Sequence, residues 1–192
     1  MPETIVLFHS ALGLRPAVRR FADQLRSAGH SVYTPDLFDG DVFDDLNEGV
    51  ARRDAIGIPA LTGRAQASVA DLPQQLVYAG FSMGAASAQY LAATRPGARG
   101  AILMHAAIPP AMMGVAKWPP VPVQIHYAVG DPWVEAAEVE ALSEAVRAAG
   151  QPCAVHSYPG SGHLFADEDT KDYDRASAAS MLDRVLRFLE KL

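Results

Sequence analysis

The stretch that decides the fold is LVYAGFSMGAASAQYLAA, residues 76–93. It begins with the apolar run Leu76–Ala79, which is typical of a buried strand, and ends with small residues in a helical pattern, Ala85–Ala93. Between them lies a G-x-S-x-G motif whose serine is Ser82. In that context the serine occupies a strained turn, and the flanking glycines let two backbones approach closely. The stretch therefore predicts a nucleophilic serine at the carboxyl end of a strand.

Short apolar runs alternate with helical patterns along the rest of the chain. The runs expected to form strands are Thr4–His9, Ser31–Thr34, Leu76–Ala79, Gly100–His105, Val121–Val129 and Cys153–Tyr158. Strands joined by helices need crossover connections, and these build a parallel sheet that is covered on both faces. We therefore predict a single α/β domain over residues 1–192, with a doubly wound, mostly parallel sheet.

A serine hydroxyl needs a base near neutral pH, and the chain offers six histidines. His163 lies in the glycine-rich turn Pro159–His163, between the last strand and the last helix. His9 and His105 stand at strand ends and are candidates for a pocket lining. The others, His30, His126 and His156, are expected to be solvated or packed. The pattern favours His163 as the base, with a solvated loop histidine as the alternative.

An acid that orients this histidine is expected at the carboxyl end of a neighbouring strand. Asp131 meets that condition because it follows the strand Val121–Val129. A competing interpretation makes it the cap of a helix that starts near Val134, since aspartate is a preferred cap. Glu135 and Asp36 are less well placed rivals. Nucleophile, acid and base then occur in the chain order associated with α/β-hydrolases.

Two segments do not follow the alternation of strands and helices. Residues 36–61 are acidic, with only a weak helical pattern around 42–55, and residues 106–120 contain four prolines. Both leave the carboxyl ends of strands, where open α/β sheets bind ligands, so both are candidate pocket walls. The alternative is that they are irregular connections. Met112, Met113 and Trp118 form an acyl pocket in the first interpretation and merely cover the sheet in the second.

Composition and charge exclude several classes of protein. The chain is 49% hydrophobic and carries a formal charge of −6, with scattered basic residues and thus no nucleic-acid footprint. Its one cysteine, Cys153, allows no internal disulfide. The N-terminus lacks the pattern of a signal peptide, and the most apolar window, 101–116, is too interrupted to span a membrane. A cytoplasmic protein without membrane contact is the expectation.

Together the motifs resemble the dienelactone hydrolase family of α/β-hydrolases over nearly the whole chain. The resemblance rests on the segments His9–Leu14, Thr34–Phe38, Gly80–Gly84, Tyr127–Pro132 and Tyr158–Phe165. It implies the α/β-hydrolase fold, with a minimal cap. It also implies that Ser82 is the nucleophile, His163 the base and Asp131 its partner. The backbone N–H groups of Ala11 and Met83 would then form the oxyanion hole.

The chain departs from the family pattern at three positions. Ser82 stands where well-known members carry a cysteine, and Ser10 stands where they carry a glutamate that helps control this cysteine. Both changes indicate an ordinary serine triad. Asp167 takes the position of an arginine that helps those enzymes hold a substrate carboxylate. An acid near the pocket repels a carboxylate, which argues against a dienelactone as the substrate.

These patterns predict a serine hydrolase that acts on a small ester, lactone or thioester without a cofactor. The expected pocket residues are Ser10, Leu12, His105, Met112, Met113 and Trp118. No metal site is expected, because consecutive acids at 167–169 more simply form a solvated turn. A ligand-binding protein on a hydrolase scaffold and an acyltransferase are the alternatives. The chain is expected to be a monomer or a homodimer.

Overall fold

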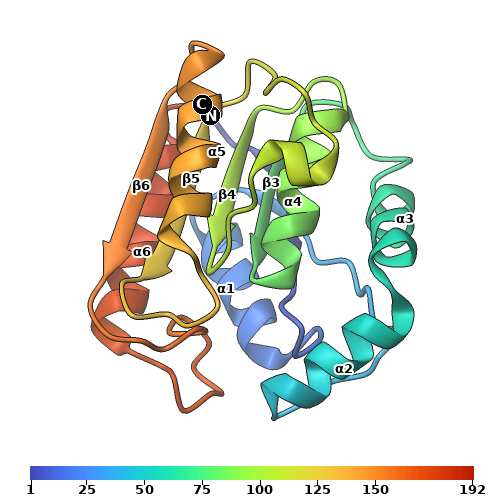
Figure 1. Cartoon of the computed structure of the whole chain (residues 1–192), viewed down its shortest axis with the longest axis vertical. Coiled ribbons are helices and arrows are strands. Elements are labelled where there is room, and N and C mark those ends of the chain that lie inside the picture. Colours follow the sequence, from blue (N-terminus) through green and yellow to red (C-terminus); the bar gives the residue numbers. More distant parts are fainter.

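Six parallel strands form one sheet in the computed structural model, which describes residues 1–192 (Figure 1). The strands are β1 (Thr4–Phe8), β2 (Ser31–Tyr33), β3 (Val77–Phe81), β4 (Gly100–Met104), β5 (Val123–Ala128) and β6 (Cys153–Tyr158). Their order across the sheet is β2-β1-β3-β4-β5-β6, and every neighbouring pair is parallel. The predicted α/β class with a doubly wound parallel sheet is confirmed. The strand order reverses between β1 and β3, so the loops after these two strands flank a topological switch point.

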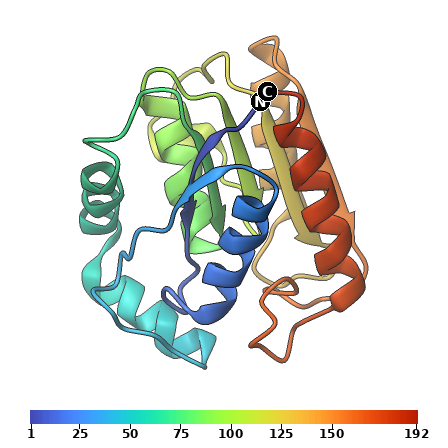
Figure 2. The ribbon, with the colours of Figure 1, turned by 180° about the vertical axis from the view of Figure 1, so that it is seen from behind.

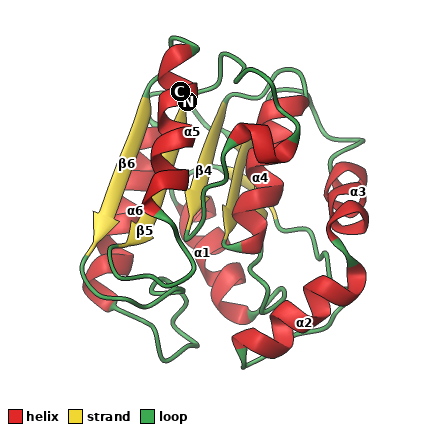
Figure 3. Cartoon of the chain, viewed as in Figure 1, coloured by secondary structure: helices red, strands yellow, loops and turns green.

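Helices cover both faces of this sheet. They are α1 (Pro16–Ser27), α2 (Leu46–Ile56), α3 (Ile58–Ser68), α4 (Met83–Thr94), α5 (Ala136–Ala148) and α6 (Arg175–Leu189), with a short 3₁₀ helix, η1 (Pro110–Met113). Helices α4 and α5 lie over the face seen in Figure 1, and α1 and α6 lie over the opposite face seen in Figure 2. Loops collect beyond the arrowheads of the strands, at the lower end of the molecule in Figure 3.

Each face of the sheet packs into its own hydrophobic core. In β1, Ile5 and Leu7 point toward α1 and α6, whereas Val6 and Phe8 point toward the α4 face. All four side chains are fully buried. Complete burial of a side chain of this kind contributes about 1.5–3 kcal/mol to folding. The two cores thus fix the central strands, from whose ends the functional loops leave.

The segment that follows β2 is more regular than the sequence indicated. Residues 46–68 form two consecutive helices, so the alternative of a merely irregular connection over residues 36–61 does not hold beyond residue 45, and the weak helical pattern around 42–55 corresponds to α2. The side chain of Asp45 caps α2 by accepting hydrogen bonds from the N–H groups of Asn47 and Glu48. Gly57, with φ of 86°, then separates α2 from α3. These helices bury few side chains, which is why hydrophobic periodicity was weak there.

The segment 106–120 is irregular apart from η1, as its prolines indicated. Trp118 within it is buried in the core on the α4 face. Its Nε1–H donates to the carbonyl of Val121 at 2.8 Å. The expectation that Trp118 lines the substrate pocket is therefore wrong, because packing and this hydrogen bond hold it inside the protein.

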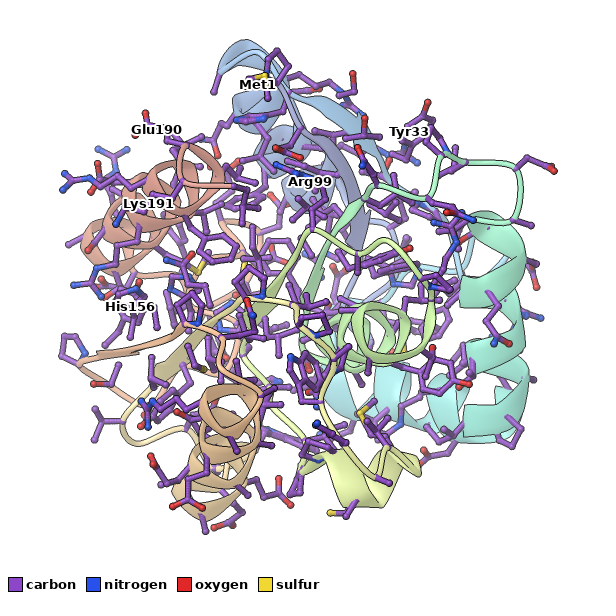
Figure 4. The ribbon with its side chains drawn as sticks, turned by 90° about the horizontal axis from the view of Figure 1, so that it is seen from above. Met1, Tyr33, Arg99, His156, Glu190 and Lys191 are labelled. Atoms are coloured by element: carbon purple, nitrogen blue, oxygen red, sulfur yellow. The ribbon has the colours of Figure 1, made fainter.

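The two ends of the chain lie together at the amino ends of the strands (Figure 2). Arg99 joins them, since its guanidinium pairs with the carboxylate of Glu3 and donates to the carbonyl of Leu192. Figure 4 shows Met1 and Glu190 at this end, and both residues line one shallow hollow. None of the helices has the length and apolar character needed to cross a membrane.

Candidate active site

Ser82 occupies a sharp turn between β3 and α4. Its backbone has φ of 53° and ψ of −113°, a conformation that is strained for a residue with a side chain. Its N–H donates to the carbonyl of Met104 at 2.7 Å, which fixes the turn to β4. A Cβ atom on Gly80 would lie 2.1 Å from the carbonyl oxygen of Gly84, and one on Gly84 would lie 2.4 Å from that of His9. Both glycines of the motif are therefore required by backbone contact.

Three side chains from different loops form one hydrogen-bonded chain at this turn. Ser82 Oγ lies 2.7 Å from His163 Nε2. The other ring nitrogen, His163 Nδ1, lies 2.8 Å from Asp131 Oδ2. His163 and Asp131 are both 5% exposed, so little water competes for these bonds. The geometry is that of a nucleophile, a base and a group that orients the base.

Asp131 also supports its own loop. Its second oxygen, Oδ1, accepts a hydrogen bond from the N–H of Trp133 at 2.9 Å. The helix α5 begins later, and Glu135 is its N-cap residue, so Asp131 does not cap it. The rival Asp36 is engaged elsewhere, because its two oxygens accept from the N–H groups of Phe38 and Gly40.

Two backbone amides are available beside the serine. Met83 is the first residue of α4, so its N–H has no acceptor within the helix. Ala11 lies in the loop after β1, where the neighbouring N–H of Leu12 donates to Ser10 Oγ at 3.1 Å. Neither amide is used in a hydrogen bond within the protein. Because Gly84 packs against His9, the turn at Ser82 lies next to the start of this loop.

The loop after β1 is held from several sides. His9 is fully buried, and its pKa is lowered because burial disfavours the charged ring. Nδ1 contacts the carbonyl of Ser10 at 2.7 Å, and Nε2 accepts from the N–H of Leu37 at 2.9 Å. A neutral ring with its proton on Nδ1 satisfies both bonds. His9 is therefore a buried support of the loop and not a pocket residue.

Helix α2 packs directly on the same loop. A Cβ atom on Gly49 would lie 2.1 Å from the carbonyl oxygen of Ala11, so the two backbones are in contact. The N–H of Phe43 donates to the carbonyl of Leu12 at 3.0 Å. Arg15 in turn donates to the carbonyl of Phe43. The segment 36–49 thus forms a wall around Ala11.

His105 also stands beside the triad, but inside the protein. It has φ of 67° and is fully buried, with neither ring nitrogen hydrogen-bonded. Its ring stacks on Phe81, meets Phe165 edge to face, and lies 6.1 Å from the ring of His163. Burial lowers its pKa well below the usual value. The expectation that His105 lines the pocket is wrong, because these aromatic rings enclose it.

A polar cleft of about 430 Å³ opens at His163. Its lining includes the predicted pocket residue Leu12 and carries acidic side chains with one lysine, namely Asp44, Asp45, Asp169, Lys171 and Asp172. Trp133 borders it with its ring 5.7 Å from that of His163, and this side chain is 48% exposed. Residues 44–47 of this lining belong to the segment 36–61, which the sequence named as a candidate pocket wall. Sequence reasoning missed Trp133 and residues 169–172, and the capping pattern Asp45-x-x-Glu48 could also have located the start of α2.

Ser10 and Asp167 face a small void near the triad. Both residues line a cavity of about 10 Å³ together with Phe81. Asp167 is 8% exposed, and burial raises the pKa of its carboxyl group. One of its oxygens accepts from the N–H of Asp169 at 3.0 Å.

The remaining candidates lie outside the cleft. Met112 and Met113 line an apolar groove along α4. Arg52 and Arg64 form ion pairs with Asp41 and Asp39, each at 2.8 Å. No group of three His, Cys, Asp or Glu side chains is arranged to hold a metal ion.

The family model of the dienelactone hydrolases matches residues 2–192 of this chain. Carboxymethylenebutenolidase of Rhodococcus opacus is 28% identical over 208 residues, which cover 98% of this chain and 81% of that enzyme. The crystal structure of P91, a dienelactone hydrolase-like promiscuous phosphotriesterase from metagenomic libraries, aligns with a TM-score of 0.85 at 22% identity and covers 100% and 87% of the two chains. Esterase PE8 aligns with a TM-score of 0.68 at 18% identity, over 98% and 92%. The fold is that of the α/β-hydrolases.

Proposed function

The chain belongs to the dienelactone hydrolase family and is a hydrolase of that type, and we propose that it cleaves small esters, lactones or thioesters through an acyl-enzyme on Ser82. One observation carries the proposal, namely the continuous hydrogen-bonded chain from Ser82 Oγ through His163 to Asp131. No other histidine of the chain contacts a serine hydroxyl and a carboxylate in this way.

In the proposed mechanism, His163 Nε2 takes the proton of Ser82 as the hydroxyl oxygen attacks the carbonyl carbon. The Nδ1–H group donates to Asp131, which holds the tautomer and stabilises the imidazolium that forms. His163 then gives its proton to the leaving oxygen or sulfur. Water attacks the acyl-enzyme by the same proton transfers in reverse, and the acid and the free serine are released.

The N–H groups of Ala11 and Met83 receive the oxyanion in this mechanism. Their supporting feature is that neither amide has an acceptor within the protein, and that Met83 follows Ser82 while Ala11 lies in the loop whose start contacts Gly84. A well-placed donor of this kind stabilises the transition state by on the order of 3–4 kcal/mol. The N-terminus of α4 adds partial positive charge at the same point.

The charge of the cleft favours neutral substrates over anionic ones. Four carboxylates, on Asp44, Asp45, Asp169 and Asp172, line it with the single cation Lys171. Asp167 adds a further buried acid nearby, and burial raises the pKa of its carboxyl group. An anionic leaving group would meet net repulsion in this surrounding. We therefore infer that the natural substrate is an uncharged ester, lactone or thioester.

Hydrolysis of p-nitrophenyl acetate by the wild type and by Ser82→Ala tests the proposal. We expect many turnovers by the wild type and a loss of about 10³-fold or more in kcat for the variant, because no nucleophile remains. Ser68→Ala, a matched change on α3 away from the triad, is the control and should behave as the wild type. Release of a single equivalent of p-nitrophenol would instead favour a ligand-binding protein. Full activity of Ser82→Ala would exclude the assigned nucleophile.

A further inference from the structure

An open apolar groove runs along α4 and shares no lining residue with the polar cleft. It has a volume of about 620 Å³, and nine of its 12 lining residues are hydrophobic. Met83, Ala86 and Tyr90 of α4 form its floor, and Ile58 of α3 and Met112 of η1 stand on its two sides. Figure 1 shows α3 next to α4, with which it is in contact. The groove thus lies between three elements and remains open to solvent.

The groove exposes apolar side chains that have no partner within the protein. Ile58 is 61% exposed and Met112 is 72% exposed. When large exposed apolar residues cluster around one hollow, the hollow is a candidate binding surface. Thr62 and Ser87 are its only hydroxyl-bearing aliphatic residues, and no charged residue lines it. The surface therefore suits an uncharged hydrocarbon.

The groove includes the residue that follows the proposed nucleophile. Met83 directly follows Ser82 in the chain and contributes to the groove, whereas His163 contributes to the polar cleft and not to the groove. Ser82 thus has its chain neighbour Met83 in the groove and its hydrogen-bonding partner His163 in the polar cleft. Ser82 itself lines neither hollow, and the proposal below rests on these two neighbours, one in each hollow.

The proton transfer from His163 to the leaving group indicates which half of the substrate lies in each hollow. The leaving oxygen or sulfur must be within reach of His163 to receive its proton, so the leaving group lies on the side of the polar cleft. The acyl group must extend the other way, past Met83. We propose that the groove binds the acyl chain, so that the preferred substrates are esters or thioesters of unbranched aliphatic acids. This inference rests on the proposed function of Ser82.

The length of the groove sets the length of the chain. The positions 83, 86, 87 and 90 follow the i, i+3, i+4, i+7 spacing of one helix face. Seven residues of helix span roughly 10 Å, which accommodates an acyl chain of about eight carbons. Shorter acids leave part of the groove in water, and much longer ones extend beyond Tyr90.

The test compares p-nitrophenyl octanoate with p-nitrophenyl acetate, both kept below the concentration at which the octanoate aggregates. The two esters share their leaving group, so the ratio of their kcat/KM values reports on the acyl side alone. For the wild type we expect a ratio of about 60 in favour of octanoate, since each of the six added methylenes, buried in a half-open groove, gains roughly twofold. In Ala86→Trp the indole fills the groove, and the ratio should fall to about one.

Two further variants control this experiment. Ala60→Trp adds the same indole to an exposed position of α3 that does not line the groove, and should keep the ratio of the wild type. Ile58→Ser removes an exposed apolar side chain without disturbing the core and should lower the ratio about threefold. If Ala86→Trp fails to fold, Ile58→Ser alone decides. A ratio that is unchanged in Ala86→Trp and in Ile58→Ser would overturn the proposal.

Labelling separates a failure of this inference from a failure of the proposed function. Octyl and ethyl fluorophosphonates react with an activated serine without needing deacylation. Faster labelling of Ser82 by the octyl probe, with the preference lowered about threefold in Ile58→Ser, would support the groove. Equal rates for the two probes would overturn the groove and leave the nucleophile intact. An absence of labelling by both probes would overturn the proposed function, and the acyl groove with it.

Discussion

The turn at Ser82 and the pair of helices α2 and α3 differ in how closely neighbouring segments pack against them. The turn lies at the centre of the sheet, where Gly80 and Gly84 are each in backbone contact with a neighbouring segment. The two helices lie at the side of the sheet, and in α3 only Leu61 and Ala65 are buried. In the first region almost any added atom collides with backbone, whereas the second has space around most of its residues.

This contrast indicates a division of labour. The centre fixes the positions of Ser82 and its neighbours, and the periphery lines the polar cleft and the apolar groove. Helix α2 is the exception, because Gly49 touches the carbonyl of Ala11 and so couples the periphery to the centre. Substitutions at glycines of each region measure how far the contrast extends.

Gly84→Ala should have the largest effect. The new Cβ would lie 2.4 Å from the carbonyl oxygen of His9 and 2.5 Å from that of Phe8, and backbone on both sides prevents an easy shift. We expect the free energy of unfolding to fall by about 3 kcal/mol or more, with loss of esterase activity. Urea denaturation and p-nitrophenyl acetate hydrolysis measure the two effects. A variant as stable as the wild type would show that the central turn is not rigid.

Gly49→Ala should act on activity more than on stability. Its Cβ would lie 2.1 Å from the carbonyl oxygen of Ala11, so either α2 or the Ala11 loop must move. Displacing one proposed oxyanion donor should lower kcat/KM by about 10- to 100-fold. Ala51→Gly, which loosens exposed α2 without approaching Ala11, is the control. An equal loss in that control would attribute the effect to helix stability instead of to the displaced amide.

Acidification should weaken the centre of the molecule. Burial lowers the pKa of His9, His105 and His126 in the folded state, while the same groups titrate near 6.5 when unfolded. The unfolded chain therefore binds more protons as the pH falls below about 6.5, and stability is lost in that direction. The raised pKa of Asp167 has the opposite sign, but its window lies at more acidic pH.

Urea denaturation at pH 7.5 and 5.5 checks this expectation. The free energy of unfolding of the wild type should be lower at pH 5.5 than at pH 7.5. In His105→Asn the difference between the two pH values should be smaller, because one buried titrating group is gone. Asparagine is chosen since it tolerates the left-handed backbone at this position. The segment 46–68 contains no histidine. An unchanged difference in His105→Asn would mean that His105 does not contribute to the acid sensitivity.

The smallest expected effect is a gain in stability. Gly63 lies in α3 with no atom within 4 Å of an added Cβ, and its backbone is helical. Gly63→Ala should raise the free energy of unfolding by about 0.5–1 kcal/mol, because alanine loses less backbone freedom. Activity toward p-nitrophenyl acetate should stay the same. Destabilisation by this change would show that α3 is closely packed around Gly63, as the central turn is around its glycines, and would contradict the difference between the two regions.

The sheet and the loops at its carboxyl edge could be predicted from the sequence because each strand carries its own signal. Apolar runs mark the strands, and parallel pairing brings their carboxyl ends to one edge whatever the length of the connections. Ser82, Asp131 and His163 each follow a strand, so their proximity needed only the sheet order. The resemblance to a known family then named the amides of Ala11 and Met83 as partners.

The remaining features depend on contacts that leave no local pattern. Helix α3 buries only two side chains, so hydrophobic periodicity could not detect it. Nothing near His105 or Trp118 in the sequence distinguishes a buried ring from one that lines a pocket. The exposure of Ile58 is likewise set by how α3 sits against α4 and not by its neighbours in the chain. Such features follow from tertiary packing, which single-sequence patterns do not carry.

The junction at Arg99 has a consequence for handling the protein. Because this arginine ties Glu3 and Leu192 together at the amino ends of the strands, both ends of the described chain leave from the pole opposite the loop that carries Ser82. A tag, a fused carrier or a surface anchor attached at either end would therefore project from the side opposite the active-site loops and leave the cleft accessible to solution. The same junction makes the backbone suited to circular permutation, with the old ends bridged by a short linker and new ones opened elsewhere.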